Sequence, residues 1–246
     1  MADYIPELAK ANPEDFGIVL ATADGRIYAV GDWDKTFTIQ SISKPFMYGL
    51  ALRLLSPSYM ERKVGVEPSG EAFNAISLDP ATGIPRNPMI NAGAIATAAQ
   101  VWRHDPGRAE ALTLEFFSSL AGRPLAVNGS VYESERASGH RNRAISHLLR
   151  NFDVIEGDVE PGLDLYFRQC SIRVTCRDLG VMAATLACQG RNPLSGERPL
   201  DAIVAVVDAT SNEDLHRLGP ALRDLPLVTA GSGVAIGLPA NFGLAP

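Results

Sequence analysis

Residues 16–30 contain two apolar runs on either side of the dipeptide Asp24-Gly25, and no other segment restricts the N-terminal fold as strongly. An Asp-Gly pair between two apolar runs is a strong signal for a tight hairpin turn. We therefore predict two antiparallel strands joined at this dipeptide.

The hairpin leads through a short extended segment, residues 36–39, into a helix predicted over residues 41–55. The apolar residues of this helix have the spacing that lines one helical face. They are Tyr48, Leu52 and Leu55. A strand therefore feeds a helix at Ser41.

Helical periodicity, broken by glycine and proline, dominates residues 88–186. Two apolar stripes support helices there: Ala109, Leu112, Phe116 and Leu120, and then Ile145, Leu148, Leu149 and Phe152. A loop at residues 192–199, with two prolines and a glycine, is the clearest boundary. Beyond it, apolar runs at residues 203–207 and 227–238 flank a polar stretch and predict a strand, a helix and a strand.

The overall composition is that of an ordinary globular protein, with 46% hydrophobic and 20% charged residues. A net charge of −6 without a basic run argues against nucleic acid or an anionic membrane as partner. The apolar runs are too short for a membrane span, and no signal peptide is evident, so we expect a cytoplasmic protein.

Neither the cysteines nor the histidines have the spacing of metal ligands. The cysteines are Cys170, Cys176 and Cys188, and the histidines are His104, His140, His147 and His216. We expect buried free thiols, no metal site and no organic cofactor.

Ser41 and Lys44 are the strongest candidates for catalysis, because they lie three residues apart at the start of a helix and share a face. A buried lysine with a lowered pKa can take the proton of a serine hydroxyl and make it nucleophilic. A serine followed by lysine at this spacing occurs roughly once in a chain of this length. The pair alone is therefore weak evidence, but it follows two strands and contains one of only four lysines.

Three further segments carry polar groups that suit a binding site, although each has a structural explanation. Residues 87–94 contain two asparagines beside small residues, which can bind an amide or form a helix cap. Residues 135–142 contain Glu135 and Asn142, which can hold an ammonium and a carboxylate or form a solvated helix start. Tyr166 is more often a core aromatic than a catalytic hydroxyl.

Five motifs in order make the chain resemble the serine-dependent glutaminase family over about residues 4–200. They are Tyr-Ile-Pro-Glu-Leu at 4–8, Gln-Ser-Ile-Ser-Lys-Pro at 40–45, Asn-Pro-Met-Ile-Asn-Ala-Gly at 87–93, Ser-Glu-Arg at 134–136 with Asn142, and Tyr-Phe at 166–167 before Cys-Ser at 170–171. The resemblance implies hydrolysis of L-glutamine to L-glutamate and ammonia.

The resemblance also implies roles for individual residues and a fold. Ser41 would be the acylated nucleophile and Lys44 its activating partner. The substrate would be held by Tyr4, Ser41, Asn91, Glu135, Asn142 and Tyr166. The implied α/β (α+β) fold is similar to serine β-lactamases and penicillin-binding proteins, with a helical lobe beside a mainly antiparallel sheet. The resemblance to the glutaminase family also implies a homodimer or homotetramer, which members of that family often form.

We expect a glutaminase-like domain over residues 1–200, with an N-terminal helix and hairpin to residue 40 and a mainly helical lobe over 41–200. After Leu200 the pattern departs from the family, because no tyrosine follows Tyr166 and no lysine follows Lys63. Residues 201–246 instead resemble a fragment of the four-carbon acid sugar kinase family, which predicts a β-α-β tail of different origin. That tail would replace the closing strands, the proton relay and part of the oxyanion hole.

Two alternatives to a working glutaminase follow from these departures. One is another β-lactamase-like serine hydrolase, which would need a second polar triplet and a basic triplet on a closing strand; neither is visible. The other is a catalytically inactive chimera that keeps groups for binding glutamine. It is favoured by the absence of a tyrosine after Tyr166.

Overall fold

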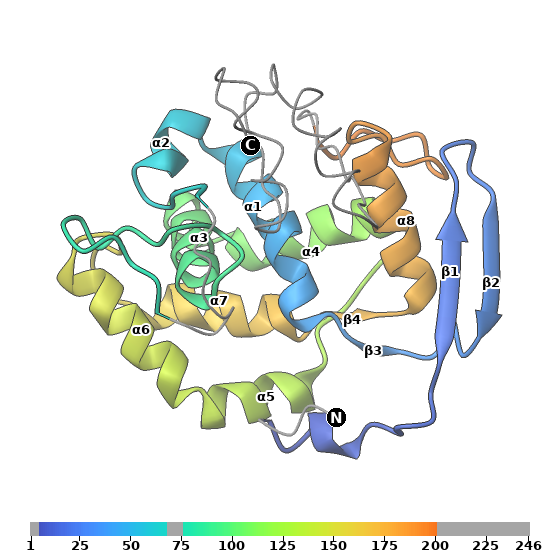
Figure 1. Ribbon diagram of the computed structural model, residues 1–246, viewed down its shortest axis with the longest axis horizontal. Helices are drawn as coiled ribbons and strands as arrows, with labels where there is room; N and C mark the ends of the chain where they lie inside the picture. The colour runs from blue at the N-terminus through green and yellow to red at the C-terminus, as the bar shows by residue number, and fades with distance from the viewer. Residues whose placement is uncertain (1–4, 68–75, 201–246) are drawn as a thin grey trace, which may run out of the picture.

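The computed structural model describes residues 5–67 and 76–200, which form a cluster of helices with a hairpin at one edge (Figure 1). The N-terminal part contains η1 (Leu8–Lys10), β1 (Gly17–Ala21), β2 (Ile27–Gly31), β3 (Phe37–Thr38), η2 (Gln40–Ile42), α1 (Ser43–Leu54) and α2 (Pro57–Glu61). The rest contains α3 (Asn91–His104), α4 (Ala109–Ala121), α5 (Gly129–Ser138), α6 (His140–Asn151), α7 (Glu160–Cys170), β4 (Arg173–Val174) and α8 (Cys176–Ala187). The prediction of a mixed, mainly helical fold is confirmed at this level.

The predicted hairpin is confirmed, because β1 and β2 pair antiparallel with Val19 opposite Ala29. Gly25 lies in the turn with φ of +84°, a conformation that glycine adopts without steric cost. The expected N-terminal helix is only the short 3₁₀ turn η1.

One face of the hairpin packs on α8, where a Cβ on Gly180 would lie 2.8 Å from the side chain of Val19. Figure 1 shows the hairpin beside α8, at the edge of the molecule. The other face carries large apolar side chains that are more than half exposed: Phe16, Ile18, Leu20, Tyr28 and Val30. The described residues therefore cover the hairpin on one side only.

The helical middle of the chain is confirmed, and its centre is the packing of α3 against α7, α1 and α6. Gly162 on α7 brings the two central helices close together, since a Cβ there would lie 2.8 Å from both Cα and Cβ of Ala99 on α3. The distance between α3 and α7 is therefore set at Gly162, where no side chain separates the two helices.

The two predicted apolar stripes hold except at Phe152, the last member of the second stripe. Phe116 and Leu120 of the first stripe and Ile145 and Leu149 of the second are buried. Phe152 was expected on the buried face of a helix but is 38% exposed. The reason is that α6 ends at Asn151, and the following turn carries the ring over the backbone of Gly83.

The segment before Ser41 forms β3, which pairs antiparallel with β4, a short strand that the sequence patterns did not predict. The predicted loop at residues 192–199 is confirmed, and it is organised by Asn192, whose side-chain oxygen accepts from the N–H groups of Leu194 and Ser195. Of the cysteines expected to be buried, Cys170 is, whereas Cys176 and Cys188 are half-buried. The predicted tail at residues 201–246 lies outside the described residues.

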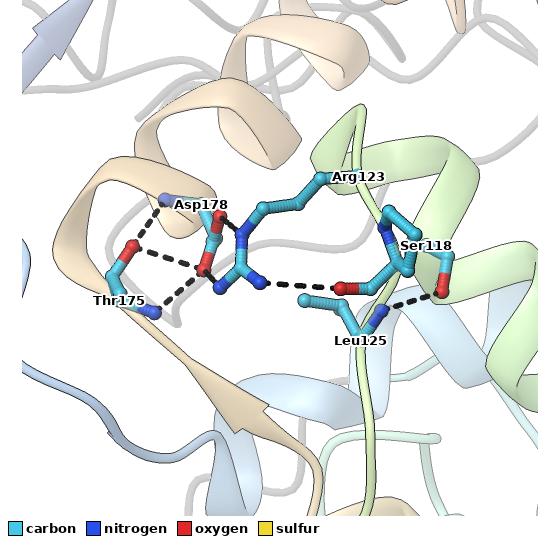
Figure 2. Close-up of polar contacts among 6 residues, drawn as sticks. Ser118, Arg123, Leu125, Thr175 and Asp178 are labelled. Carbon is cyan, nitrogen blue, oxygen red and sulfur yellow. Dashed lines mark hydrogen bonds and ion pairs between the residues drawn. The ribbon is translucent and has the colours of Figure 1, made fainter.

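The start of α8 is held by a buried carboxylate that serves two partners (Figure 2). Asp178 and Thr175 form a reciprocal capping box, and Thr175 donates to Asp178 through both its N–H and its hydroxyl. The guanidinium of Arg123 also donates to Asp178, with Nε 2.7 Å from Oδ1. Asp178 is fully buried, and its charge is tolerated there because these donors surround it.

Replacing Asp178 with alanine should lower the free energy of unfolding by about 3 kcal/mol, because a capping box and a buried ion pair are lost together. Urea unfolding followed by circular dichroism measures this. Asp34→Ala, at an exposed aspartate, is the control and should change stability by less than about 0.5 kcal/mol. Equal, small losses in both variants would contradict the role given to Asp178.

Candidate active site

Ser41 lies in a tight turn between β3 and α1, and the preceding residue has an unusual backbone. Gln40 has φ of +49°, in the left-handed region that non-glycine residues rarely adopt. Such conformations persist only where the surroundings hold them, and they gather at active sites. Ser41 itself is exposed, and its hydroxyl makes no hydrogen bond to the part of the chain that the structure describes.

Lys44 is 3% exposed and donates from Nζ to two acceptors. These are the carbonyl oxygen of Met89, at 3.0 Å, and Oδ1 of Asn91, at 2.7 Å. Burial lowers the pKa of Lys44 from its ordinary value. A neutral amine has two hydrogens and one lone pair, so these two bonds use both hydrogens and leave the lone pair free to accept a proton.

Asn91 begins α3 and places its side chain against Lys44, as just described. The structural explanation for this segment applies to the neighbouring asparagine, because Oδ1 of Asn87 accepts from the N–H groups of Met89 and Ile90. Gly93 is required by this turn, since a Cβ there would lie 2.0 Å from the carbonyl oxygen of Asn87. Asn87 therefore shapes the turn, and Asn91 faces Lys44.

Glu135 is buried on α5, with 6% of its surface exposed, although its neighbours Arg136 and Ala137 are exposed. Its Oε2 has no hydrogen-bond partner among the described residues. Burial raises the pKa of Glu135 to about 7. The solvated helix start suggested by its sequence context is therefore wrong at this position, and the orphaned carboxylate oxygen suits a cationic ligand.

Tyr166 lies on α7, 3% exposed, and its side chain hydrogen-bonds the thiol of Cys170 one helical turn later. Burial raises the pKa of that thiol to about 12, and the nearby Glu135 carboxylate adds to the rise, while Lys44 and Ser43 act against it. Cys170 therefore lies among groups from α1, α5 and α7, which brings Lys44, Glu135 and Tyr166 into one neighbourhood. Sequence reasoning placed Cys170 only in the core; its position four residues after Tyr166 was the available signal.

Asn142, a predicted site residue, makes no hydrogen bond to the members of this cluster among the described residues. Asn142 is half-buried on α6, and its backbone oxygen accepts from the hydroxyl of Ser146. Its side-chain amide has no hydrogen-bond partner within residues 5–67 and 76–200. Tyr4 lies outside the described residues. The structure thus brings together Lys44, Asn91, Glu135 and Tyr166, next to the turn that carries Ser41.

Residues that could hold a metal ion are absent from the described ranges, where no three histidine, cysteine, aspartate or glutamate side chains gather. Among the helices that the structure describes, none is long and apolar enough to cross a membrane.

A family model described as Glutaminase matches residues 1–209 of this chain. The chain belongs to the glutaminase family. A glutaminase of Nostoc sp. is 52% identical over 204 residues, which are 82% of this chain and 60% of the relative. A glutaminase of Corynebacterium efficiens is 42% identical over an alignment of 254 positions, which covers 100% of this chain and 60% of the relative. The chain therefore spans about three fifths of the length of these glutaminases.

A crystal structure of Mglu in its glutamate form matches with a TM-score of 0.78 at 41% identity, over 96% of this chain and 55% of that one. The family assignment made from the five motifs is confirmed. The sugar kinase origin of residues 201–246 stays a prediction, and the alignment with the Corynebacterium efficiens glutaminase runs through this segment, since it covers the whole chain.

Proposed function

We propose that this glutaminase-family chain hydrolyses the side-chain carboxamide of L-glutamine to L-glutamate and ammonia, with Ser41 as nucleophile and Lys44 as its base. The observation that carries the proposal is the environment of Lys44. It is buried, its pKa is lowered, and both hydrogens of its neutral amine are directed at Met89 and Asn91. A lysine held in this way, three residues after an exposed serine, suits general base catalysis.

In the acylation step, Oγ of Ser41 attacks the carboxamide carbon while Lys44 accepts the hydroxyl proton. The tetrahedral intermediate collapses with cleavage of the carbon–nitrogen bond, and Lys44 returns the proton to the nitrogen, which leaves as ammonia. Water then attacks the ester carbon and Lys44 takes its proton. As the ester bond breaks, Lys44 returns this proton to Oγ of Ser41, which releases L-glutamate and regenerates the serine hydroxyl. Backbone N–H groups at the start of α1 are suited to stabilise the oxyanion.

The substrate would be held by the cluster around Lys44 together with Asn142 on α6. The unpartnered oxygen of Glu135 would accept the α-ammonium, because a buried carboxylate is stabilised by a cation at that position. Asn91 and Tyr166 would bind the polar groups of glutamine, and Asn142 its carboxylate. Support comes from the glutamate named in the structure of Mglu, with which this chain shares its fold.

The Ser-Lys arrangement also supports a finer statement about the fold. We infer a β-lactamase-like architecture, in which the nucleophile lies where a sheet meets a helical lobe. The short pairing of β3 with β4 just before Ser41 is consistent with this. Within it, residues 1–200 would form the glutaminase-like domain, and a β-α-β tail over 201–246 would complete its sheet. Assembly into dimers or tetramers stays a prediction, which light scattering tests.

Ammonia and glutamate released from L-glutamine by the purified chain test the proposed function. Equal molar amounts of the two products are expected, and added hydroxylamine should intercept the acyl-enzyme and give the γ-glutamyl hydroxamate. A mock purification from cells without the chain controls for contaminating amidases. Release equal to that of the mock preparation would overturn the proposal and favour the inactive chimera.

The affinity for glutamine should rise with pH through about 7, because Glu135 must be ionised to pair with the substrate ammonium. Below that pH the carboxyl is neutral in the free enzyme, and binding must first remove its proton. Simple linkage then gives a KM about tenfold higher at pH 6 than at pH 8. Initial rates over a range of glutamine concentrations measure this dependence.

Two variants separate Glu135 from other titrating groups. Glu135→Gln should weaken binding and lose the pH step in KM, since no proton is then exchanged at that position. Glu133→Gln changes an exposed glutamate on the same helix and should keep the step. A pH step that persists in Glu135→Gln would remove this residue from ammonium recognition.

A further inference from the structure

A chain of two hydrogen bonds joins α7 to the turn that carries Ser41. The hydroxyl of Ser43 donates to the carbonyl oxygen of Gln40, at 2.6 Å. The same hydroxyl accepts from Nε2 of Gln169, at 2.9 Å. Both Ser43 and Gln169 are fully buried, so water cannot replace the bond between them.

The acceptor at the end of this chain is the residue with the strained backbone. Gln40 has φ of +49° and directly precedes Ser41. A non-glycine residue in this region costs free energy, which the surroundings must offset. Two contacts do so. The Ser43 hydroxyl donates to the carbonyl oxygen of Gln40, and the side-chain amide of Gln40 donates to Oγ1 of Thr38, at 3.0 Å. The backbone on both sides of Ser41 is therefore fixed, although the serine hydroxyl makes no hydrogen bond within the described residues.

We infer that Gln169 is a positioning residue for Ser41, acting through the Ser43 hydroxyl on the Gln40 carbonyl. The inference rests on the proposed function, which makes Ser41 the nucleophile. Gln169 donates the hydrogen bond that orients the Ser43 hydroxyl. That hydroxyl has one hydrogen, which it directs at Gln40, while it accepts from Gln169 and lies beside the thiol of Cys170. Gln169 does not touch the substrate, so its effect belongs to the chemical step rather than to binding.

The geometry requires a hydrogen-bond donor at position 169. An acceptor there would attract the Ser43 hydrogen away from Gln40, whereas a donor sends it toward Gln40. Glutamine satisfies the demand with Nε2, while its Oε1 has no partner among the described residues. A glutamate would act as donor only while protonated and as acceptor once ionised.

The test compares Gln169→Leu with a matched control, Gln100→Leu. Gln100 is also a buried glutamine, and it joins Tyr59 to the carbonyl of Val154, away from Ser41. Both variants should lose stability. Only Gln169→Leu should lower kcat, by roughly tenfold for the loss of one orienting hydrogen bond. Its KM for glutamine should stay within about twofold of the wild type.

Gln169→Glu provides a readout that a purely structural role would not change. Its kcat, relative to the wild type at the same pH, should rise as the pH falls and the buried carboxyl becomes a donor. A constant ratio, or equal losses of kcat in Gln169→Leu and Gln100→Leu, would overturn the inference.

Hydrogen–deuterium exchange of the peptide spanning residues 38–44 adds a measurement that needs no turnover. Exchange at this peptide should be faster in Gln169→Leu than in the wild type and unchanged in Gln100→Leu. If the wild type releases no ammonia, the proposed function fails, and exchange alone decides whether Gln169 holds the turn. Unchanged exchange in Gln169→Leu would show that Gln169 does not hold the turn.

Discussion

Replacing Ser41 with alanine is expected to lower ammonia release from L-glutamine by about 10⁴-fold or more, to the level of the mock preparation. The hydroxyl forms the acyl bond in the proposed reaction, so its removal leaves that reaction without its nucleophile. Ser41 is exposed and its side chain supports no described hydrogen bond, so folding should be unaffected. A coupled glutamate assay together with a thermal melt measures both quantities.

A matched control for this variant is Ser138→Ala, which removes another exposed serine hydroxyl, one that donates to the carbonyl oxygen of Ser134. It should keep full activity. The intact mass of wild-type enzyme quenched during turnover should include a glutamyl adduct, and the adduct should be absent from Ser41→Ala. Turnover that survives in Ser41→Ala would assign the nucleophile to another group.

Lys44→Met should reduce kcat by about 10³-fold, the effect of removing a general base, while leaving the protein folded. Methionine has a volume close to that of lysine and suits a buried position. Replacing a buried ionisable group with an apolar one of similar size is often neutral or stabilising. Two acceptors lose their donor, namely the carbonyl of Met89 and Oδ1 of Asn91, which limits any gain. We expect the free energy of unfolding to stay within about 2 kcal/mol of the wild type.

Lys63→Met serves as the control, because we expect it to change stability rather than activity. Lys63 bridges the carbonyl of Asp153 and the carboxylate of Glu156, far along the chain from Ser41. Its loss should lower stability slightly and leave glutamine hydrolysis unchanged. If Lys44→Met retained wild-type kcat, the base in the proposed mechanism would have to be a different residue.

Local patterns predicted the parts of the fold that depend on neighbouring residues. The Asp24-Gly25 pair, together with the apolar runs on either side of it, predicts a hairpin turn, and the spacing in the helices follows from their own geometry. The error at Phe152 arose because apolar spacing does not show where a helix ends. The pairing of β3 with β4 was not predicted, because it joins residues that are distant in the sequence.

The candidate site shows the same division between local and distant information. The three-residue spacing of Ser41 and Lys44 is visible in the sequence, but the contact of Lys44 with Asn91 is not. Glu135 was the clearest failure of residue-by-residue reasoning, because its charged neighbours suggested a solvated surface although its own side chain is buried. Only the resemblance to a family, carried by motifs in order, linked these residues before the fold was known.

The close packing at Gly162 has a consequence for which amides the enzyme accepts. α3 begins with Asn91, and α7 carries Tyr166 one turn after Gly162, so both helices contribute a wall of the site. Their distance is set where a single hydrogen of Gly162 faces Ala99. Glutamine and asparagine differ in length by one methylene group. A methyl group added at residue 162 would push the two helices apart, so we expect discrimination between the two amides in the proposed reaction to depend on the apolar core as well as on the polar groups of the site.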